Sequence, residues 1–239
     1  MATAMVLAGC GGPPVDPLSD RSPVGPTVEV ELTEREAYST VATASLPRIE
    51  ARVAPDLDAE VIVDLAHPTE SGAPLVFQVI SERDGWVEVL LPVRPNGSTG
   101  WVLGSAVELT RNQYRIEVDT GTHRLTLFER GRVRMEVPVA IGTGATPTPL
   151  GEFYLTELLQ PPDPTGPYGT YAYGLSGYSE TLQSFNGGDG VIGLHGTNEP
   201  SSLGSDVSHG CVRLANETIN ELVKILPLGT PVVITGPSS

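Results

Sequence analysis

The sequence predicts a mainly β protein, with a small barrel followed by a larger β-rich domain that carries a few short helices. Two observations support this fold class. Short runs of β-branched and apolar residues recur along most of the chain, separated by turns rich in Gly, Pro and Asn. With 27 Gly and 22 Pro in 239 residues, long helices are not expected, and only residues 217–226 have the apolar spacing of an amphipathic helix.

Residues 1–47 are expected to precede the folded domains. The run Leu7-Ala8-Gly9-Cys10 resembles the lipobox of bacterial lipoproteins, in which a signal peptidase cuts before a cysteine that becomes lipid-modified. The apolar stretch before Cys10 has no basic residue, so either a leader begins further upstream or the resemblance is accidental. Residues 11–27 hold five prolines and are expected to form an extended, unfolded tether. Residues 28–46 fit either a strand or a short helix.

Residues 48–110 are expected to form the small barrel. The strand-like runs of this part lie at residues 60–65, 75–80 and 85–91. Asn96-Gly97 is a hairpin signal. The string from Gly100 to Val107 resembles the end of bacterial SH3-like domains, which often accompany cell-wall enzymes. Trp86 and Trp101 are expected in the barrel core rather than on a ligand-binding face, because large aromatic side chains usually pack.

Residues 111–239 are expected to form the larger domain. Its strand-like runs lie at residues 116–118, 124–128, 133–141 and 231–234. A turn is expected at 129–132, and Asn216 is expected to cap the helix at 217–226. The long connection at 160–190 is typical of a functional loop. Its aromatic residues either line a substrate groove or pin the loop, and they are Tyr168, Tyr171, Tyr173, Tyr178 and Phe185.

The charge balance excludes one class of partner. The chain has 14 basic and 29 acidic residues, which gives a formal net charge of −15. Nucleic-acid binding needs a basic face to neutralise phosphates, so no nucleic-acid partner is expected. An acidic surface mainly favours solubility. No stretch after Cys10 is long and apolar enough to span a bilayer.

Cys211 is the candidate nucleophile. It follows Ser208-His209-Gly210 and is the only cysteine besides Cys10. A thiol attacks carbon as the thiolate, so it needs a base that takes its proton. Gly210 lets the backbone approach a ligand, and the nearby cation of Arg213 favours the thiolate. The competing interpretation is a buried cysteine that only packs.

Two histidines are candidates for the base. His195 ends an apolar run and is expected at the end of a strand. His209 lies two residues before Cys211 and, on an extended segment, would point to the same side. The spacing alone leaves the choice between these two rings open. The other two histidines, His67 and His123, are expected to be ordinary surface residues.

Residues 115–235 resemble the catalytic domain of L,D-transpeptidases of the YkuD type. The residues that carry the resemblance are His195-Gly196-Thr197-Asn198 and Ser208 to Leu214, supported by Thr146 to Gly151. It implies a mostly β fold with a loop over the active site. It also implies Cys211 as the nucleophile and His195 as the proton donor and acceptor. The pocket would be shaped by Ser208, His209, Gly210 and Gly196.

The resemblance implies that the substrates are peptidoglycan stem peptides in the bacterial cell envelope. Cys211 would attack the carbonyl of the diamino acid at the third stem position and expel D-alanine. The resulting thioester would be resolved by an amine of another stem, which forms a 3→3 cross-link. The oxyanion needs hydrogen-bond donors, for which the N–H groups of Gly210 and Cys211 are candidates. Arg213 would contact either a substrate carboxylate or an internal partner.

Several alternatives remain open. With water as acceptor the same site would be an L,D-carboxypeptidase, and with a protein lysine it would anchor protein to the wall. A non-catalytic wall-binding protein is a third possibility, but such a protein needs no thiol beside two histidines. No cofactor or metal is expected, since His195, His209 and Cys211 lack the usual zinc-ligand spacings. A lipid at Cys10 would tether the protein to a membrane on its extracytoplasmic side.

Overall fold

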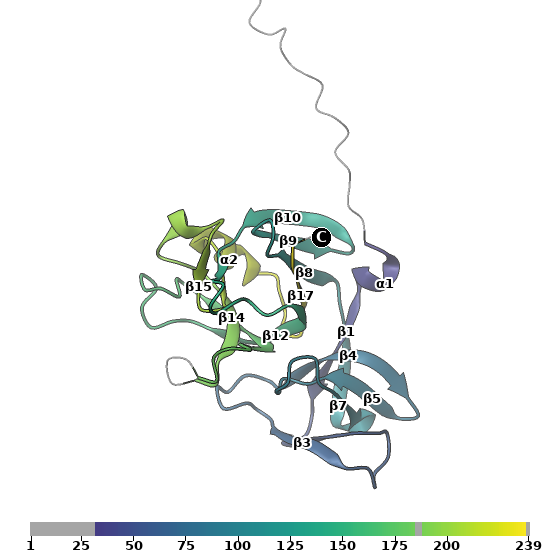
Figure 1. The fold of residues 1–239 in the computed structure, drawn as a ribbon. Helices are drawn as coiled ribbons and strands as arrows, with labels where there is room; N and C mark the ends of the chain where they lie inside the picture. Colours follow the sequence, from purple (N-terminus) through teal and green to yellow (C-terminus); the bar gives the residue numbers. More distant parts are fainter. Residues whose placement is uncertain (1–31, 185–187, 238–239) are drawn as a thin grey trace, which may run out of the picture.

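Two β-sheets, formed by successive parts of the chain, make up most of the computed structural model (Figure 1). The structure describes residues 32–184 and 188–237. Strands predominate in these ranges, which contain only two short α-helices, so the predicted mainly β fold class is confirmed. Cys10 and the expected tether at 11–27 lie outside the described residues.

The N-terminal sheet has seven antiparallel strands in the order β3-β2-β6-β5-β4-β1-β7. Its strands are β1 (Ser39–Ala44), β2 (Arg48–Arg52), β3 (Val61–Ala66), β4 (Val76–Arg83), β5 (Trp86–Leu90), β6 (Thr99–Leu103) and β7 (Val107–Asn112). The three strand-like runs predicted in this part form β3, β4 and β5. Phe77, Val89 and Val102 are fully buried in a separate core of this sheet. Trp86 is also buried, whereas Trp101 is partly exposed.

The segment that the sequence left unassigned, residues 28–46, contains both kinds of structure. A single helical turn, α1 (Glu34–Ala37), precedes strand β1. Strand β1 pairs with both β4 and β7, which lie far from it in the sequence. The sheet therefore spans residues 39–112 and extends past both expected barrel boundaries, 48 and 110. The likeness of this part to SH3-like domains stays a prediction.

The C-terminal sheet has eight strands in the order β10-β9-β8-β17-β12-β13-β14-β16. Its strands are β8 (Tyr114–Asp119), β9 (Arg124–Glu129), β10 (Arg132–Pro138), β12 (Gly151–Leu159), β13 (Ala172–Tyr178), β14 (Val191–His195), β16 (Val212–Arg213) and β17 (Pro231–Thr235). Two more strands, β11 (Ile141–Gly142) and β15 (Asp206–Ser208), pair in parallel beside it. The predicted turn at 129–132 joins β9 to β10, and Arg130 and Gly131 both adopt positive φ there. The 3₁₀ helices are η1 (Gly104–Ala106) and η2 (Pro200–Ser202).

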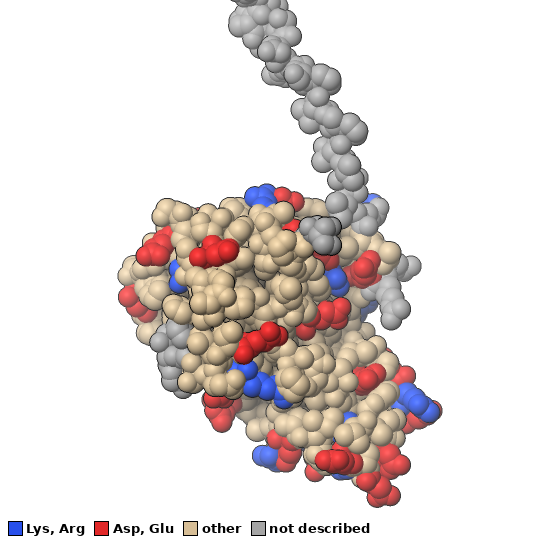
Figure 2. Space-filling view, in the orientation of Figure 1, with Lys and Arg blue, Asp and Glu red and all other residues tan. Residues whose placement is uncertain are grey.

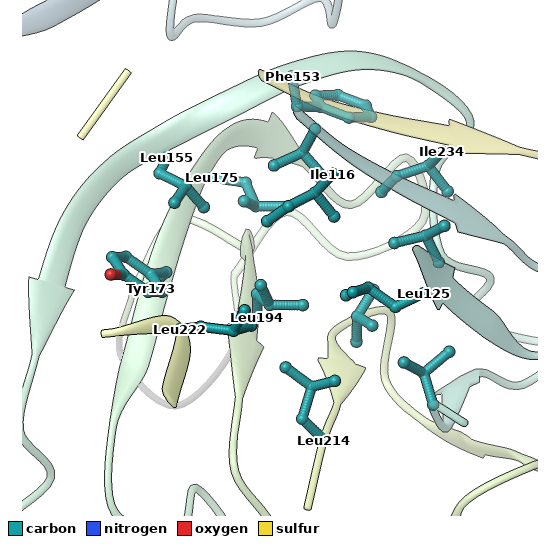
Figure 3. Close-up of a cluster of buried hydrophobic side chains, with 14 of the residues drawn as sticks. Ile116, Leu125, Phe153, Leu155, Tyr173, Leu175, Leu194, Leu214, Leu222 and Ile234 are labelled. Carbon is teal, nitrogen blue, oxygen red and sulfur yellow. The ribbon is translucent and has the colours of Figure 1, made fainter. Parts of the chain in front are cut away.

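The C-terminal sheet curls around one hydrophobic core (Figure 3). The core draws side chains from almost every strand of the sheet and from helix α2 (Asn216–Leu222). Examples labelled in Figure 3 are Ile116, Leu125, Phe153, Leu155, Leu194 and Leu222. Burial of this apolar surface is the main force that brings strands distant in sequence to one site.

Helix α2 differs from the prediction in its cap and its length. Ile219 and Leu222 are fully buried, so the predicted apolar face is correct. The helix ends at Leu222 rather than at residue 226, and turns follow it. The prediction that Asn216 caps the helix is wrong: Ala215 occupies the cap position. The Asn216 side-chain oxygen instead accepts a hydrogen bond from the Thr170 N–H at 3.3 Å, because a tertiary contact competes for it.

The two sheets meet at a small buried cluster, which we call the junction cluster. It consists of Val41, Val76 and Leu90 from the N-terminal sheet and Tyr154 from β12. The Tyr154 ring is fully buried, and its hydroxyl donates a hydrogen bond to the Leu90 carbonyl at 3.2 Å. Burial holds the pKa of Tyr154 well above its ordinary value, so the hydroxyl keeps its proton. The sheets are therefore fixed to each other by apolar contact and by a buried hydrogen bond.

We expect the substitution Tyr154→Phe to destabilise the protein by about 1–2 kcal/mol, because it removes a donor to a buried carbonyl. For a chain of this size the melting temperature should fall by about 2–8 °C in differential scanning calorimetry. Tyr114→Phe is the matched control, since the Tyr114 hydroxyl is partly exposed and lies 3.4 Å from its acceptor on Glu129. Equal melting temperatures for Tyr154→Phe and the unchanged protein would show that the junction hydrogen bond contributes nothing.

Acidic side chains are scattered over both parts of the face seen in Figure 2. They outnumber the basic ones in the whole chain, 29 to 14. On this face the acidic side chains are dispersed rather than gathered into one patch. No helix in the described ranges combines the length and the apolar character needed to cross a bilayer.

Candidate active site

Parallel pairing of β14 and β16 brings the two sequence-predicted catalytic residues together. Leu194 lies opposite Val212, and His195 lies opposite Arg213. His195 ends β14, as the sequence predicted, while Cys211 immediately precedes β16. Two segments separated by the 3₁₀ helix η2 and strand β15 therefore present a histidine and a cysteine at one edge of the sheet.

The Cys211 thiol is free and half-buried, and it lines the same pocket as His195. The Gly193 N–H donates a hydrogen bond to the Cys211 Sγ at 3.3 Å. A Cβ atom placed on Gly193 would lie 3.8 Å from Cys211 Sγ and 3.9 Å from His195 Cδ2. The two side chains therefore both border the space above Gly193.

The His195 ring is buried and held in one orientation. Its Nδ1 lies 2.6 Å from the Gly196 carbonyl oxygen. Because a carbonyl only accepts, Nδ1 carries the hydrogen and Nε2 keeps its lone pair. The Tyr168 ring packs against it, with centroids 4.9 Å apart and planes inclined at 57°. The imidazole is thus presented as a neutral base.

Burial keeps both groups of this pair uncharged at neutral pH. Burial is the main reason that the pKa of His195 is lowered to about 4; the bond to the Gly196 carbonyl opposes this shift, and the nearby Arg213 cation adds a smaller lowering. Burial also raises the pKa of Cys211 above its ordinary value, although the Gly193 N–H and Arg213 favour the thiolate. The resting state is therefore a thiol beside a neutral imidazole rather than an ion pair.

The turn from Ser208 to Cys211 is locked by the Ser208 hydroxyl. This hydroxyl donates to the Cys211 carbonyl at 2.6 Å and accepts from the Gly210 N–H at 3.1 Å. Gly210 has φ of 116°, a conformation that favours glycine, so the segment is bent rather than extended. His209 consequently lies exposed at the pocket rim, unlike the buried His195.

The Thr-Pro corner at 146–151 supports this turn from the other side. The Thr146 hydroxyl donates to the Ser208 carbonyl at 3.3 Å, and the Thr148 hydroxyl accepts from the Gly142 N–H at 2.8 Å. A Cβ atom on Gly142 would lie 2.3 Å from the Thr146 carbonyl oxygen, so the corner packs directly on the backbone there. The corner thereby helps to hold the turn from Ser208 to Cys211 in place.

A pocket of about 220 Å³ opens beside the thiol. Of the sequence-predicted site residues, it is lined by Cys211, His195, Ser208, His209 and Arg213. Gly196 and Gly210 contribute through their backbone hydrogen bonds. The Arg213 side chain is mostly buried; one of its terminal nitrogens lies 3.8 Å from Glu199, and its Nε has no hydrogen-bond partner among the described residues. A cation with spare donors therefore borders the pocket.

The prediction of one long loop at 160–190 is wrong in its middle, where strand pairing forms β13 (Ala172–Tyr178), but the tyrosines of this range fulfil both roles that the sequence left open. Tyr168 lines the pocket beside His195. Tyr173 and Tyr178 pin the chain, since their hydroxyls donate to the carbonyls of Leu226 and Pro92. Phe185 lies outside the described residues. Nothing in the sequence distinguished Tyr168 from the other tyrosines, because their roles depend on contacts between distant segments.

The remaining histidines lie outside the pocket lining. His67 accepts a hydrogen bond from the Leu75 N–H within the N-terminal sheet, and His123 lies 2.6 Å from Asp206 at the surface. Within the described part of the chain, no group of three or more His, Cys, Asp or Glu side chains is arranged to hold a metal ion.

Fold and site together define a cysteine–histidine pair in a pocket at the edge of a curled sheet. The model of the L,D-transpeptidase catalytic domain family, YkuD, matches residues 113–234. The chain belongs to this family. The match covers the C-terminal sheet up to the last residue but one of β17 and every residue of the candidate active site, and it leaves the N-terminal sheet outside.

Two named relatives from Bacillus agree with this assignment. The chain is 42% identical over 122 residues to the L,D-transpeptidase YkuD of Bacillus licheniformis, a match that covers 51% of this chain and 66% of that one. It is 36% identical over 151 residues to YkuD of Bacillus subtilis, covering 61% of this chain and 84% of the relative. A solved structure, Bdellovibrio bacteriovorus Bd1075, shares 31% identity with a TM-score of 0.41, covering 51% of this chain and 47% of that one.

Proposed function

We propose that this protein is a peptidoglycan L,D-transpeptidase that forms 3→3 cross-links through a thioester on Cys211. The observation that carries the proposal is the shared position of the two reactive groups. The Cys211 thiol and the buried, oriented His195 ring both border the space above Gly193 and line one pocket. Membership of the L,D-transpeptidase family supports the same chemistry.

The first half-reaction acylates the cysteine. The Cys211 Sγ attacks the carbonyl carbon of the diamino acid at the third stem position while its proton passes to His195 Nε2. Both groups start neutral, so the proton leaves sulfur as the new S–C bond forms. The tetrahedral intermediate collapses, the C–N bond breaks, and the proton on Nε2 passes to the departing amine of D-alanine.

The second half-reaction transfers the acyl group. An amine of a second stem attacks the thioester carbonyl, and His195 Nε2 takes the proton that this nitrogen loses. The C–S bond breaks, and the proton returns to the Cys211 sulfur. One amide bond is broken and one is formed, so the cross-link needs no external energy source or cofactor.

Two groups beside the thiol are assigned to charge stabilisation. The Gly210 N–H already donates to Ser208, whereas no described residue accepts from the Cys211 N–H. We therefore place the Cys211 N–H at the developing oxyanion. The Arg213 guanidinium, with its unpartnered Nε, is assigned to a carboxylate of the stem peptide.

Mass spectrometry of the purified protein with tetrapeptide muropeptides tests the function. A cross-linked dimer that has lost one D-alanine supports the proposal. A trimmed monomer without dimer would identify a carboxypeptidase, in which water resolves the thioester. Unchanged muropeptides that nevertheless bind the protein would identify a wall-binding module instead.

We also propose that Cys10 carries a lipid that tethers the enzyme to a membrane outside the cytoplasm. The lipobox-like run at 7–10 and the Pro-rich segment after it support this proposal. We expect Cys10→Ser to move most of the protein from the membrane to the supernatant fraction after cell lysis, because stable anchoring needs the acyl chains. Cys211→Ser, which keeps Cys10, is the control. Equal membrane fractions for Cys10→Ser and the unchanged protein would rule out the anchor.

A further inference from the structure

One wall of the catalytic pocket is built by the chain that follows β13. Ser179 and Leu182 line the pocket from one arm of this loop, and Gly190 lines it from the other arm. We call residues 178–182 and 188–190 the wall segment. The Ser179 N–H donates to the Gly190 carbonyl at 2.8 Å, which joins the two arms at their base.

Arg94, from the connection between β5 and β6 of the N-terminal sheet, binds both arms of the wall segment. Its Nη1 donates to the Ser179 carbonyl at 2.7 Å, and its Nη2 donates to the carbonyls of Leu182 and Asp189, each at 3.0 Å. A guanidinium is planar and carries five N–H donors, so it suits several acceptors at once. One side chain outside the catalytic sheet thereby holds three main-chain groups of the pocket wall.

Tyr178, where the wall segment begins, is held by the same connection. The Asn96 side-chain amide donates to the Tyr178 carbonyl and accepts from its N–H, both at 2.8 Å. The Tyr178 hydroxyl donates to the Pro92 carbonyl at 2.8 Å, and the Arg94 guanidinium lies 4.8 Å from the Tyr178 ring centroid. The amide of Asn96 therefore pairs with Tyr178 as the backbone of a neighbouring strand would.

The fit between these parts is close. A Cβ atom on Gly190 would lie 2.5 Å from the Leu182 carbonyl oxygen and 3.1 Å from Arg94 Nη2. Gly190 also has φ of 71°, so glycine is favoured there by backbone conformation as well as by space. The connection itself is braced by the Leu91 N–H to Ser98 carbonyl bond at 2.8 Å, and the junction cluster fixes its sheet.

We infer that Arg94 is a positioning residue for the acyl-donor peptide, and that the N-terminal sheet completes the catalytic pocket through it. This inference takes its substrate from the proposed function. Arg94 contacts neither Cys211 nor His195, so it acts on the shape of the wall rather than on the chemical step. Its loss should weaken donor binding and leave the reactivity of the thiol unchanged.

Arg94→Ala is compared with Arg94→Lys and with Arg83→Ala, an exposed arginine of β4 that lies 3.4 Å from the adjacent Asp84. We expect Arg94→Ala to raise the KM for the tetrapeptide donor about tenfold, as for a lost contact of about 1.4 kcal/mol, while kcat changes less than about twofold. Arg94→Lys keeps the positive charge but lacks the planar guanidinium group, so its KM should lie between those of Arg94→Ala and the unchanged enzyme. Arg83→Ala should match the unchanged enzyme.

Two readouts separate this inference from the proposed function. Hydrogen–deuterium exchange should show faster exchange of the Tyr178 and Ser179 amides in Arg94→Ala, and alkylation of Cys211 by iodoacetamide should proceed at an unchanged rate. If Arg94→Ala does not fold, Asn96→Ala takes its place in the test. Asn96→Ala removes both hydrogen bonds to Tyr178, so it should also raise the KM and speed exchange of the Tyr178 and Ser179 amides, with an unchanged rate of Cys211 alkylation. Unaltered KM and amide exchange in Arg94→Ala would overturn the inference. Absence of turnover in every protein, with amide exchange faster in Arg94→Ala than in Arg83→Ala, would overturn only the proposed function.

Discussion

Replacing Cys211 by alanine is expected to abolish both cross-linked dimer and acyl-enzyme. The substitution removes the atom that forms the thioester, and no other cysteine is present in residues 32–184 or 188–237. We expect dimer formation from tetrapeptide muropeptides to fall by at least about ten-thousandfold. Chromatography of the muropeptides measures the dimer, and intact-protein mass spectrometry measures the adduct.

This test is decisive because Cys211→Ala should lose activity while it still folds. The thiol is only half-buried, so Cys211→Ala should retain the far-ultraviolet circular dichroism spectrum and the thermal transition of the unchanged protein. Binding of muropeptide should also persist, because Arg213 and the pocket wall remain. Dimer formed by Cys211→Ala at the rate of the unchanged enzyme would refute the thioester mechanism.

His195→Gln is expected to lower kcat/KM by about a hundredfold to ten-thousandfold. Glutamine retains a donor for the Gly196 carbonyl but offers no group that takes and returns a proton. His123→Gln is the matched control, because His123 lies at the surface outside the pocket lining and contacts Asp206. Steady-state kinetics with tetrapeptide donor measures the effect. Comparable rates for the two variants would exclude His195 as the base.

The pH dependence of kcat/KM for the unchanged enzyme should reflect the pKa values of His195 and Cys211. In the proposed mechanism His195 acts as a base, so activity should fall as the pH drops through the pKa of its ring. Burial has lowered that pKa to about 4, so the acid limb of kcat/KM should lie near pH 4 rather than near the ordinary value of 6.5. The raised pKa of Cys211 should move the alkaline limb above the ordinary thiol value. An acid limb near 6.5 would indicate a solvated imidazole instead.

Local patterns in the sequence anticipated most strands of this fold. The runs at 60–65, 75–80 and 124–128 became strands, as their apolar and β-branched residues predicted. In the run at 124–128 the alternation of residues also matches a sheet with one buried face, since Leu125 and Leu127 are buried. The short segment at 39–44 escaped prediction, since its partners β4 and β7 come later in the chain. The prediction for Asn216 was wrong because of a contact with another distant segment. Asparagine is favoured at helix caps, but the Asn216 side chain accepts a hydrogen bond from the Thr170 N–H instead.

The residues of the candidate site could likewise be predicted only in part from the sequence. Cys211, His195 and the residues around them were identifiable because the chemistry of acyl transfer requires a thiol and a base, and a family motif carries both. Gly193 and Tyr168 were not identifiable in this way. A glycine in an apolar run and a tyrosine in a loop have no signal of their own; their places beside the thiol and the imidazole arise from strand pairing and loop packing.

Residue types and short spacings thus sufficed for the class of fold, the candidate nucleophile and the family resemblance, because each depends on neighbours along the chain. The protonation state of the Cys211–His195 pair and the hydrogen bonds from Arg94 to the wall segment could be derived only from the folded structure. Burial shifts a pKa only when other segments exclude water, and Arg94 meets the carbonyls of Ser179, Leu182 and Asp189 only because the two sheets pack against each other.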